Sequence, residues 1–118
     1  MGGTAAGIEN GYPDWGLTSF TELIEYASRI VDQIDIPMLA DADNGGGNPL
    51  TVYRTTRAFE RAGVGAVMFE DRIRTERIGQ TADVIPTEEM VDRIRAAVGA
   101  RSEMVIVARS DALAAGRI

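Results

Sequence analysis

One segment near the middle of the chain constrains its fold more than any other. The apolar stretch that ends at Ala40 leads into Asp41 and Asp43, three consecutive glycines follow, and Asn48 then opens a new segment. A short apolar run, a glycine-rich turn and an Asn-Pro start indicate a strand, a loop and a helix in succession. Alternate side chains of an extended strand share a face, so Asp41 and Asp43 are expected to point the same way.

Two carboxylates on one face at the end of a buried strand repel each other unless a cation lies between them. Asp41 and Asp43 therefore predict a site for a divalent metal ion. The alternative is a turn without any metal, because aspartate before glycine is also common in turns.

The rest of the chain alternates helical and strand patterns. Ser19 and Glu22 form a capping box ahead of apolar residues at helical spacing through Ile34, and Gly63 and Gly99 are expected to end the two later helices. Residues 72–84 lack clear periodicity and are expected to form a long loop. The predicted helices begin at the caps Ser19, Asn48 and Thr87, and the predicted strands are residues 36–40, 66–69 and 104–108.

Three apolar strands that alternate with amphipathic helices are typical of an α/β protein with a parallel sheet covered by helices. Each predicted strand carries its charges only at its carboxyl end. Parallel α/β proteins have their active sites at this edge of the sheet. The side chains expected to converge there are Asp41, Asp43, Glu70, Arg109 and Asp111.

Composition narrows the chemistry. The formal net charge is −6 without a basic stripe, so neither nucleic acid nor a membrane is expected as a partner. No apolar stretch approaches the roughly 20 residues that span a bilayer, and the amino terminus lacks the pattern of a signal peptide, so a cytoplasmic location is expected. Because cysteine and histidine are absent, catalysis would depend on carboxylates, arginine, hydroxyl groups and a hard metal ion.

The length is short for a closed barrel. A (β/α)8 barrel takes about 250 residues, and the 118 residues of this chain supply about half of that. The sequence begins in a glycine-rich turn at Met1 and stops at Ile118 in what reads as a connecting loop. We therefore expect residues 1–118 to form one domain of parallel βα units, about half of a (β/α)8 barrel, truncated at both ends.

Five stretches of the chain resemble the isocitrate lyase/phosphoenolpyruvate mutase superfamily. They occur in the family's order across almost the whole chain, and together they are far more specific than any one alone. The stretches are Gly11–Leu17, Asp41–Asn48, Phe69–Asp71, Pro86–Met90 and Ala108–Ala112. The resemblance implies a (β/α)8 barrel that is usually assembled as a tetramer, so a homo-oligomer is expected.

The resemblance also implies a metal and a reaction class. Members of the superfamily bind Mg²⁺ or Mn²⁺ and make or stabilise the enolate of an α-keto acid. Asp41 and Asp43 match the metal carboxylates, with Asp43 the closest ligand, and Glu70 matches the acid that holds metal-bound water. The expected activity is that of a lyase or mutase acting on small α-keto or 2-hydroxy carboxylic acids.

Substrate contacts are implied in the same way. Arg109 matches the arginine that grips the substrate carboxylate, and Asp14 matches a catalytic carboxylate that also faces the metal. Gly2 and Gly3 match positions where backbone N–H groups meet the substrate, and Asp41 is expected to contact the substrate as well as the metal. Taken alone, Arg109 is equally consistent with an ion pair to the acid two residues further on.

One stretch departs from the family pattern. Lyases of the superfamily carry a cysteine and a histidine in the loop after Glu70, and the cysteine handles the proton on the departing carbon acid. Ile78 and Gln80 stand at these two positions. Isoleucine cannot transfer a proton, so phosphonomutase or oxaloacetate decarboxylase chemistry fits this loop better than the usual lyase reaction.

Two further classes of function stay open at this point. An open half-barrel exposes apolar strand edges, which favours pairing with another chain, so the chain could be a structural or oligomerising piece without catalysis of its own. It could also be a module that binds small carboxylates with Mg²⁺ and does not convert them. Concentration-dependent folding distinguishes the first of these from an independent enzyme.

Overall fold

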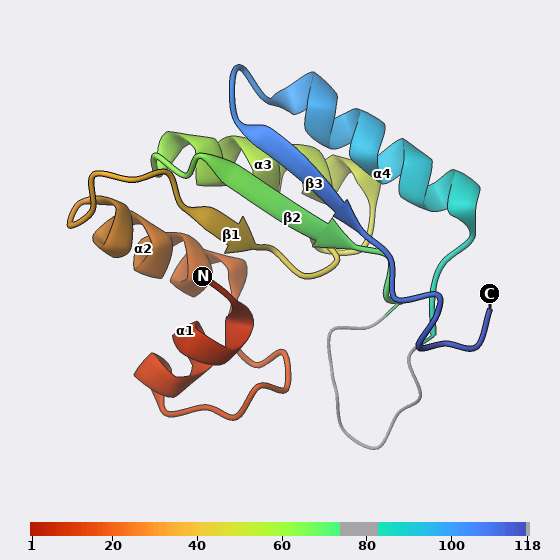
Figure 1. Cartoon of the computed structure of the whole chain (residues 1–118), viewed down its shortest axis with the longest axis horizontal. Helices are drawn as coiled ribbons and strands as arrows, with labels where there is room; N and C mark the ends of the chain where they lie inside the picture. The colour runs from red at the N-terminus through yellow and green to blue at the C-terminus, as the bar shows by residue number, and fades with distance from the viewer. Residues whose placement is uncertain (74–82, 118) are drawn as a thin grey trace.

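The computed structural model describes residues 1–73 and 83–117. Three strands form one sheet, and α2, α3 and α4 lie along one of its faces (Figure 1). The α/β class and the parallel βα arrangement predicted from the sequence are confirmed. The elements are α1 (Gly3–Asn10), α2 (Phe20–Val31), β1 (Leu39–Asp41), α3 (Pro49–Arg61), β2 (Ala66–Glu70), α4 (Thr87–Ala100) and β3 (Val105–Arg109).

The sheet has the order β1-β2-β3, and both strand pairs are parallel. Val67 at the centre of β2 lies beside Ala40 of β1 and beside Ile106 of β3. Because side chains alternate along a strand, these three residues share the face that packs against the helices. The side chains that alternate with these three along each strand point to the opposite face of the sheet.

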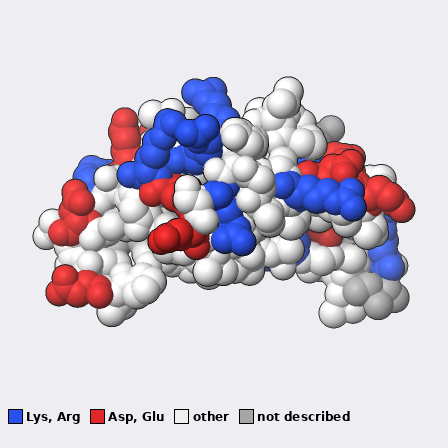
Figure 2. All heavy atoms as spheres, turned by 90° about the horizontal axis from the view of Figure 1, so that it is seen from above, with Lys and Arg blue, Asp and Glu red and all other residues white. Residues whose placement is uncertain are grey.

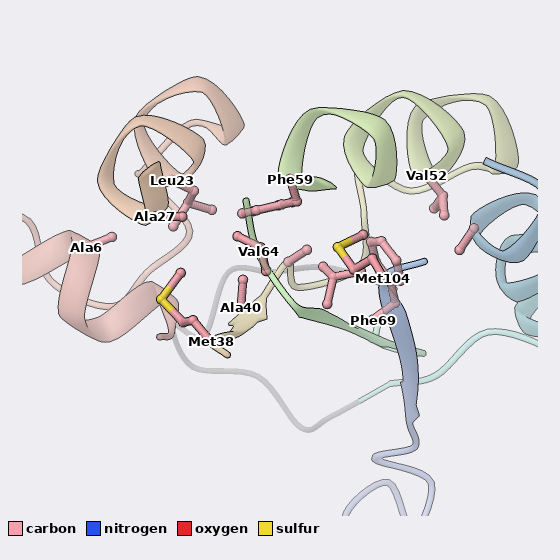
Figure 3. Packing of buried hydrophobic residues seen from close by; sticks show 13 residues of the cluster. Ala6, Leu23, Ala27, Met38, Ala40, Val52, Phe59, Val64, Phe69 and Met104 are labelled. Atoms are coloured by element: carbon pink, nitrogen blue, oxygen red, sulfur yellow. The ribbon is translucent and has the colours of Figure 1, made fainter. Parts of the chain in front are cut away.

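The core lies between the sheet and the helices (Figure 3). Side chains from α2 and α3 point down onto the strands, and α1 adds Ala6 at one end of the cluster. Each of the larger apolar side chains removed from water here contributes roughly 1.5–3 kcal/mol. The buried members include Leu23, Ala27, Ala40, Val52, Phe59, Val67, Phe69, Ala97 and Met104.

Two helix starts follow their sequence signals. The Ser19 hydroxyl accepts the N–H of Glu22, and the Glu22 carboxylate accepts the N–H of Ser19, as a capping box requires. At the start of α3, the Asn48 side chain accepts the N–H groups of Leu50 and Thr51. This cap ends the loop that follows β1, so it also fixes where that loop joins the helix.

The free edge of β1 is paired with the first residue of the chain. The Met1 ammonium donates to the carbonyl of Leu39 at 2.7 Å, and the N–H of Asp41 donates to the carbonyl of Met1 at 2.8 Å. Met1 therefore lies alongside β1 as an added strand residue would. Gly2 and Gly3, which follow it, are placed at the carboxyl edge of the sheet.

Three helix boundaries differ from the sequence predictions. The glycine-rich start, expected to be a turn, forms α1 from Gly3, although no side chain caps it. In α4, Pro86 occupies the cap position instead of Thr87, because the Pro86 carbonyl already accepts the N–H of Met90. Gly99 does not end α4, which runs through it to residue 100, because glycine inside a helix weakens it without breaking it.

The segment before β1 also differs from its prediction. The strand was expected from residue 36, but it begins at Leu39, and Ile36 is exposed. Pairing starts at Met38, whose carbonyl accepts the N–H groups of Gly65 and Ala66, because Pro37 has no N–H to donate. The loop predicted at 72–84 is described only at its two ends, because residues 74–82 lie outside the described part. At those ends, Arg72 and Val84 form a single antiparallel bridge.

The face of the sheet opposite the helices carries apolar side chains that meet solvent. Leu39 is 42% exposed and Val105 is 56% exposed, at the start of the two outer strands. The surface in Figure 2 shows arginine and acidic side chains interspersed. Within residues 1–73 and 83–117, no helix is long and apolar enough to cross a membrane.

Of the three glycines in the loop between β1 and α3, Gly45 leaves the least room for a side chain. Its φ is +69°, in the left-handed region that disfavours residues with a side chain. A Cβ atom at this position would lie 2.6 Å from a methyl group of Val52 and 2.9 Å from the Phe69 ring. Gly47 has a similar φ of +88°, but a Cβ there would meet no atom within 4 Å. The two glycines therefore separate the cost of backbone strain from the cost of crowding.

We expect Gly45→Ala to lower the free energy of unfolding by about 2–4 kcal/mol, because it combines positive φ with overpacking of the core. Gly47→Ala is the matched control and should cost only about 1–2 kcal/mol. Urea denaturation followed by circular dichroism measures both. Equal losses of unfolding free energy for the two variants would show that Gly45 is not packed tightly against the core.

Candidate functional site

The candidate site lies where the three strands end. Asp41, Glu70 and Arg109 are the last residues of β1, β2 and β3. In the register, Glu70 lies directly beside Arg109, and Asp41 lies beside Met68, two residues before Glu70. Side chains two apart on a strand share a face, so all three point to the face opposite the helices. The convergence at one edge that the sequence predicts is confirmed for these residues.

The centre of this edge is a buried carboxylate. Glu70 is 1% exposed, and its Oε2 lies 3.2 Å from Nη1 of Arg109 in an ion pair. This contact is an ion pair without a hydrogen bond, so Oε2 has no hydrogen-bond partner among the described residues. A buried acid oxygen without a hydrogen bond is uncommon in folded proteins, which makes Oε2 a candidate acceptor for a water or an ion.

Burial raises the pKa of Glu70 to about 7. The Arg109 guanidinium opposes this shift, and the negative charges of Asp43, Asp111 and Asp41 add to it, in that order. Loss of hydration disfavours the charged form, and like charges disfavour it further. A cation placed among these acids would favour the ionised form of Glu70.

Asp41 and Asp43 lie close together, but for a different structural reason from the one predicted. The strand ends at Asp41, and Asp43 has a left-handed backbone with φ = +48°. The N–H of Asp43 donates to Oδ1 of Asp41 at 3.0 Å, and the carbonyl of Asp43 accepts the N–H of Glu70 at 2.8 Å. The alternation argument is therefore wrong at Asp43, because the pair forms a turn at the strand end. The turn still keeps both acids at the carboxyl edge.

The start of α1 brings the glycines and Asp14 to the same edge. A Cβ atom on Gly3 would lie 3.5 Å from Oδ1 of Asp14 and 4.0 Å from Oδ2 of Asp43. One on Gly2 would lie 3.9 Å from Oδ2 of Asp41. These distances are ordinary van der Waals contacts, so Gly2 and Gly3 lie directly beside the three acids. A small cavity here is lined by Gly3, Pro13, Asp14, Gly16, Thr18, Leu23 and Asp43.

Asn44 and Arg93 hold the loop after β1, and neither was predicted as part of the site. Asn44 is buried, accepts the N–H of Gly46 and donates to the carbonyl of Ile73. Buried Arg93 reaches the Asn44 carbonyl at 3.5 Å and pairs with Glu89 at 2.6 Å. Its position was detectable, because helical spacing from buried Ala97 puts Arg93 on the inner face of α4.

These residues fit a hard divalent cation. Among the described residues, no group of three or more His, Cys, Asp or Glu side chains is arranged so that it could hold a metal ion by itself. Mg²⁺ keeps several waters and takes only one or two carboxylates directly, so a complete protein cage is not required. Oε2 of Glu70, which makes no hydrogen bond and lies close to the Asp41 and Asp43 charges, is the kind of acceptor that such water satisfies. Asp43 and Asp41 would supply the direct ligands.

The raised pKa of Glu70 predicts a pH dependence of stability. Glu70 titrates near 4.5 when unfolded and near 7 when folded, so its neutral form favours folding below pH 4.5 and this advantage is lost as pH rises through 7. Glu70→Gln should therefore stabilise the metal-free chain at pH 8, by up to about 3 kcal/mol, and change little at pH 4. Urea denaturation at both pH values measures this.

Glu60→Gln is a control of opposite sign. Backbone N–H groups of Met104, Glu103 and Ser102 bond to the Glu60 carboxylate and lower its pKa. That contribution is present above the unfolded pKa and is lost as pH falls, so this substitution should destabilise the chain at pH 8. A Glu70→Gln effect that does not change between pH 4 and pH 8 would contradict the assignment of a buried charge.

A parallel α/β sheet with acids and an arginine at the carboxyl ends of its strands is typical of α/β enzymes, whose active sites lie at this edge of the sheet. The profile of the phosphoenolpyruvate phosphomutase family matches residues 1–117. The chain therefore belongs to this family, within the PEP mutase/isocitrate lyase superfamily. Its βα units correspond to part of the (β/α)8 barrel of superfamily members.

Individual relatives agree with this placement. The chain is 43% identical over 118 residues to a 2-methylisocitrate lyase of Shewanella oneidensis, covering 94% of this chain and 40% of the relative. It is 43% identical over 116 residues to an oxaloacetate decarboxylase of Pseudomonas putida, covering 95% of this chain and 40% of the relative. The structure of a phosphonopyruvate hydrolase complexed with oxalate and Mg²⁺ matches with a TM-score of 0.87 at 30% identity, covering 99% of this chain and 41% of that one. The chain thus spans about 40% of the length of these curated relatives.

Proposed function

We propose that this chain supplies the metal- and carboxylate-binding part of an enzyme that stabilises the enolate of a small α-keto or 2-hydroxy carboxylic acid. The observation that carries the proposal is the convergence of Asp41, Glu70 and Arg109 on one face at the strand ends. The turn that adds Asp43, and the position of Gly3 beside Asp14 and Asp43, complete the arrangement.

Each residue has a role that its surroundings support. Asp43 and Asp41 offer oxygen ligands to Mg²⁺ or Mn²⁺, which when bound would act as a Lewis acid toward negative charge on a substrate oxygen. Arg109 is one-third exposed and offers a cation to a substrate carboxylate. Asp14, which accepts the Thr4 hydroxyl at 2.8 Å, lies by the same cavity as Gly3 and is placed to exchange a proton there.

The relatives narrow the reaction class. Their names describe cleavage of a carbon–carbon bond, decarboxylation, or chemistry at a phosphonate carbon. All three create negative charge next to a carboxylate or keto group, which is the charge that a metal and an arginine can stabilise. The complex of one structural neighbour with oxalate and Mg²⁺ supports oxalate as a probe for this chain.

Decarboxylase or phosphonate chemistry is favoured over the usual lyase reaction. The support is the sequence after Glu70, where Ile78 and Gln80 stand in place of the lyase cysteine and histidine, although both residues lie outside the described part. A chain without cysteine cannot use a thiol to move a proton. A phosphoryl rearrangement moves no proton, and the enolate left by decarboxylation can take its proton from water.

The binding of oxalate tests the proposal. In calorimetry, oxalate should bind the chain in the presence of Mg²⁺, and chelation of the metal with EDTA should abolish binding. Asp43→Asn should weaken binding by about 100-fold or more, since it removes the charge of the closest ligand. Asp35→Asn changes an exposed acid far from the site and should leave the affinity within about two-fold.

Metal-independent oxalate binding, or equal effects of the two asparagine variants, would contradict the proposal.

A second candidate is a non-catalytic, oligomerising half-barrel, which the exposed Leu39 and Val105 on the open sheet face support. Under that alternative, a well-folded chain would not bind oxalate, and sedimentation would show concentration-dependent association.

A further inference from the structure

The side edge of the Arg109 guanidinium is already occupied. Its Nε donates to Oδ1 of Asp111 at 2.9 Å, and its Nη2 donates to Oδ2 of the same carboxylate at 3.0 Å. This two-bond fork fixes the plane and the direction of the guanidinium. The opposite corner, Nη1, is the one that lies 3.2 Å from Glu70.

Asp111 is itself held in place from β2. Its N–H donates to Oδ1 of Asp71 at 2.8 Å, and the Ser110 hydroxyl donates to Oδ2 of Asp71 at 2.5 Å. Asp71 is buried, and its own carbonyl accepts the N–H of Ile85. These bonds fix the backbone of Asp111. Its carboxylate is largely buried and also lies 3.7 Å from Nε of Arg72, so it is a held support for Arg109.

A competitor for Arg109 lies within reach. The Glu70 carboxylate is buried, lies beside Arg109 in the sheet register, and has an oxygen without a hydrogen bond. If the fork to Asp111 were lost, the guanidinium could turn and form a two-bond pair with Glu70. That pair would occupy the Nη1 end of Arg109, which now faces the acid cluster. Fewer N–H groups of Arg109 would then be available to a ligand.

We propose that Asp111 is a positioning residue for Arg109. It holds the side edge of the guanidinium so that the Nη1 end stays directed at the acid cluster, where a small carboxylate ligand can reach it. The inference rests on the proposed function for its ligand, because it assumes that Arg109 meets a substrate carboxylate. Its geometric part, the fork from Asp111, is independent of that assumption.

A double-mutant cycle tests whether Asp111 acts through Arg109. The probe is oxalate with saturating Mg²⁺, measured by calorimetry on the chain and on its Asp111→Ala, Arg109→Ala and double variants. Asp111→Ala alone should weaken oxalate binding by about 10-fold or more, and in the Arg109→Ala background its effect should shrink to about two-fold. Equal effects of Asp111→Ala in both backgrounds would overturn the proposal, because a purely structural role does not depend on Arg109.

A second measurement needs no bound ligand. In ¹⁵N NMR, the Nε–H of Arg109 should exchange slowly with water, and the signal is assigned by its loss in Arg109→Lys. Asp111→Asn keeps the size of the side chain and should speed this exchange at least about 10-fold, whereas Asp92→Asn on the surface of α4 should not change it. Fast exchange in the unsubstituted chain would overturn the proposal.

The two measurements separate the possible failures. If the unsubstituted chain does not bind oxalate but Arg109 Nε–H is protected by Asp111, the proposed function fails and the fork remains. If oxalate binds but the cycle is additive, the proposed function stands and Asp111 is not a positioning residue. Circular dichroism of each variant shows that it is folded before either result is used.

Discussion

The burial of the Glu70 carboxylate is the constraint around which the carboxyl edge of the sheet is organised. An ionised acid in this position needs a nearby positive charge, and Arg109 on the next strand supplies one. That single pair does not offset burial, because the pKa of Glu70 is still raised to about 7. A second cation among Asp41 and Asp43 would complete the compensation. The cost of burying an ionised Glu70 is thus a physical argument that supports the proposed metal ion.

The backbone around the site holds the acids close together in fixed positions. Asp43 adopts a left-handed conformation so that its N–H contacts Asp41, while its carbonyl pairs with β2. Gly45 lets the loop pass against the core, and Asn44 with Arg93 holds the loop from the other side. The site therefore depends on packing beneath the sheet as well as on the acids themselves. Such support is what pre-organises a charged site before its ligand binds.

Much of the architecture follows from patterns in the sequence. Apolar strands with charges at their ends predicted a parallel sheet and the meeting of Glu70 with Arg109, because register aligns strand ends. The approach of Asp43 to Asp41 was predicted for the wrong reason, since alternation applies only while the strand continues. The helix α1 was missed because its glycine-rich start has no capping side chain. The fork between Arg109 and Asp111 was left undecided because sequence spacing allows an arginine to face either partner.

The most direct test of the account is the position of a bound cation. Crystals of the chain grown with Mn²⁺ and oxalate would show the metal by anomalous diffraction. We expect one strong peak beside Asp43 and Asp41, with Glu70 close by and the oxalate against the Nη1 end of Arg109. A well-ordered carboxyl edge without a metal peak, or a peak only at another place on the chain, would contradict it.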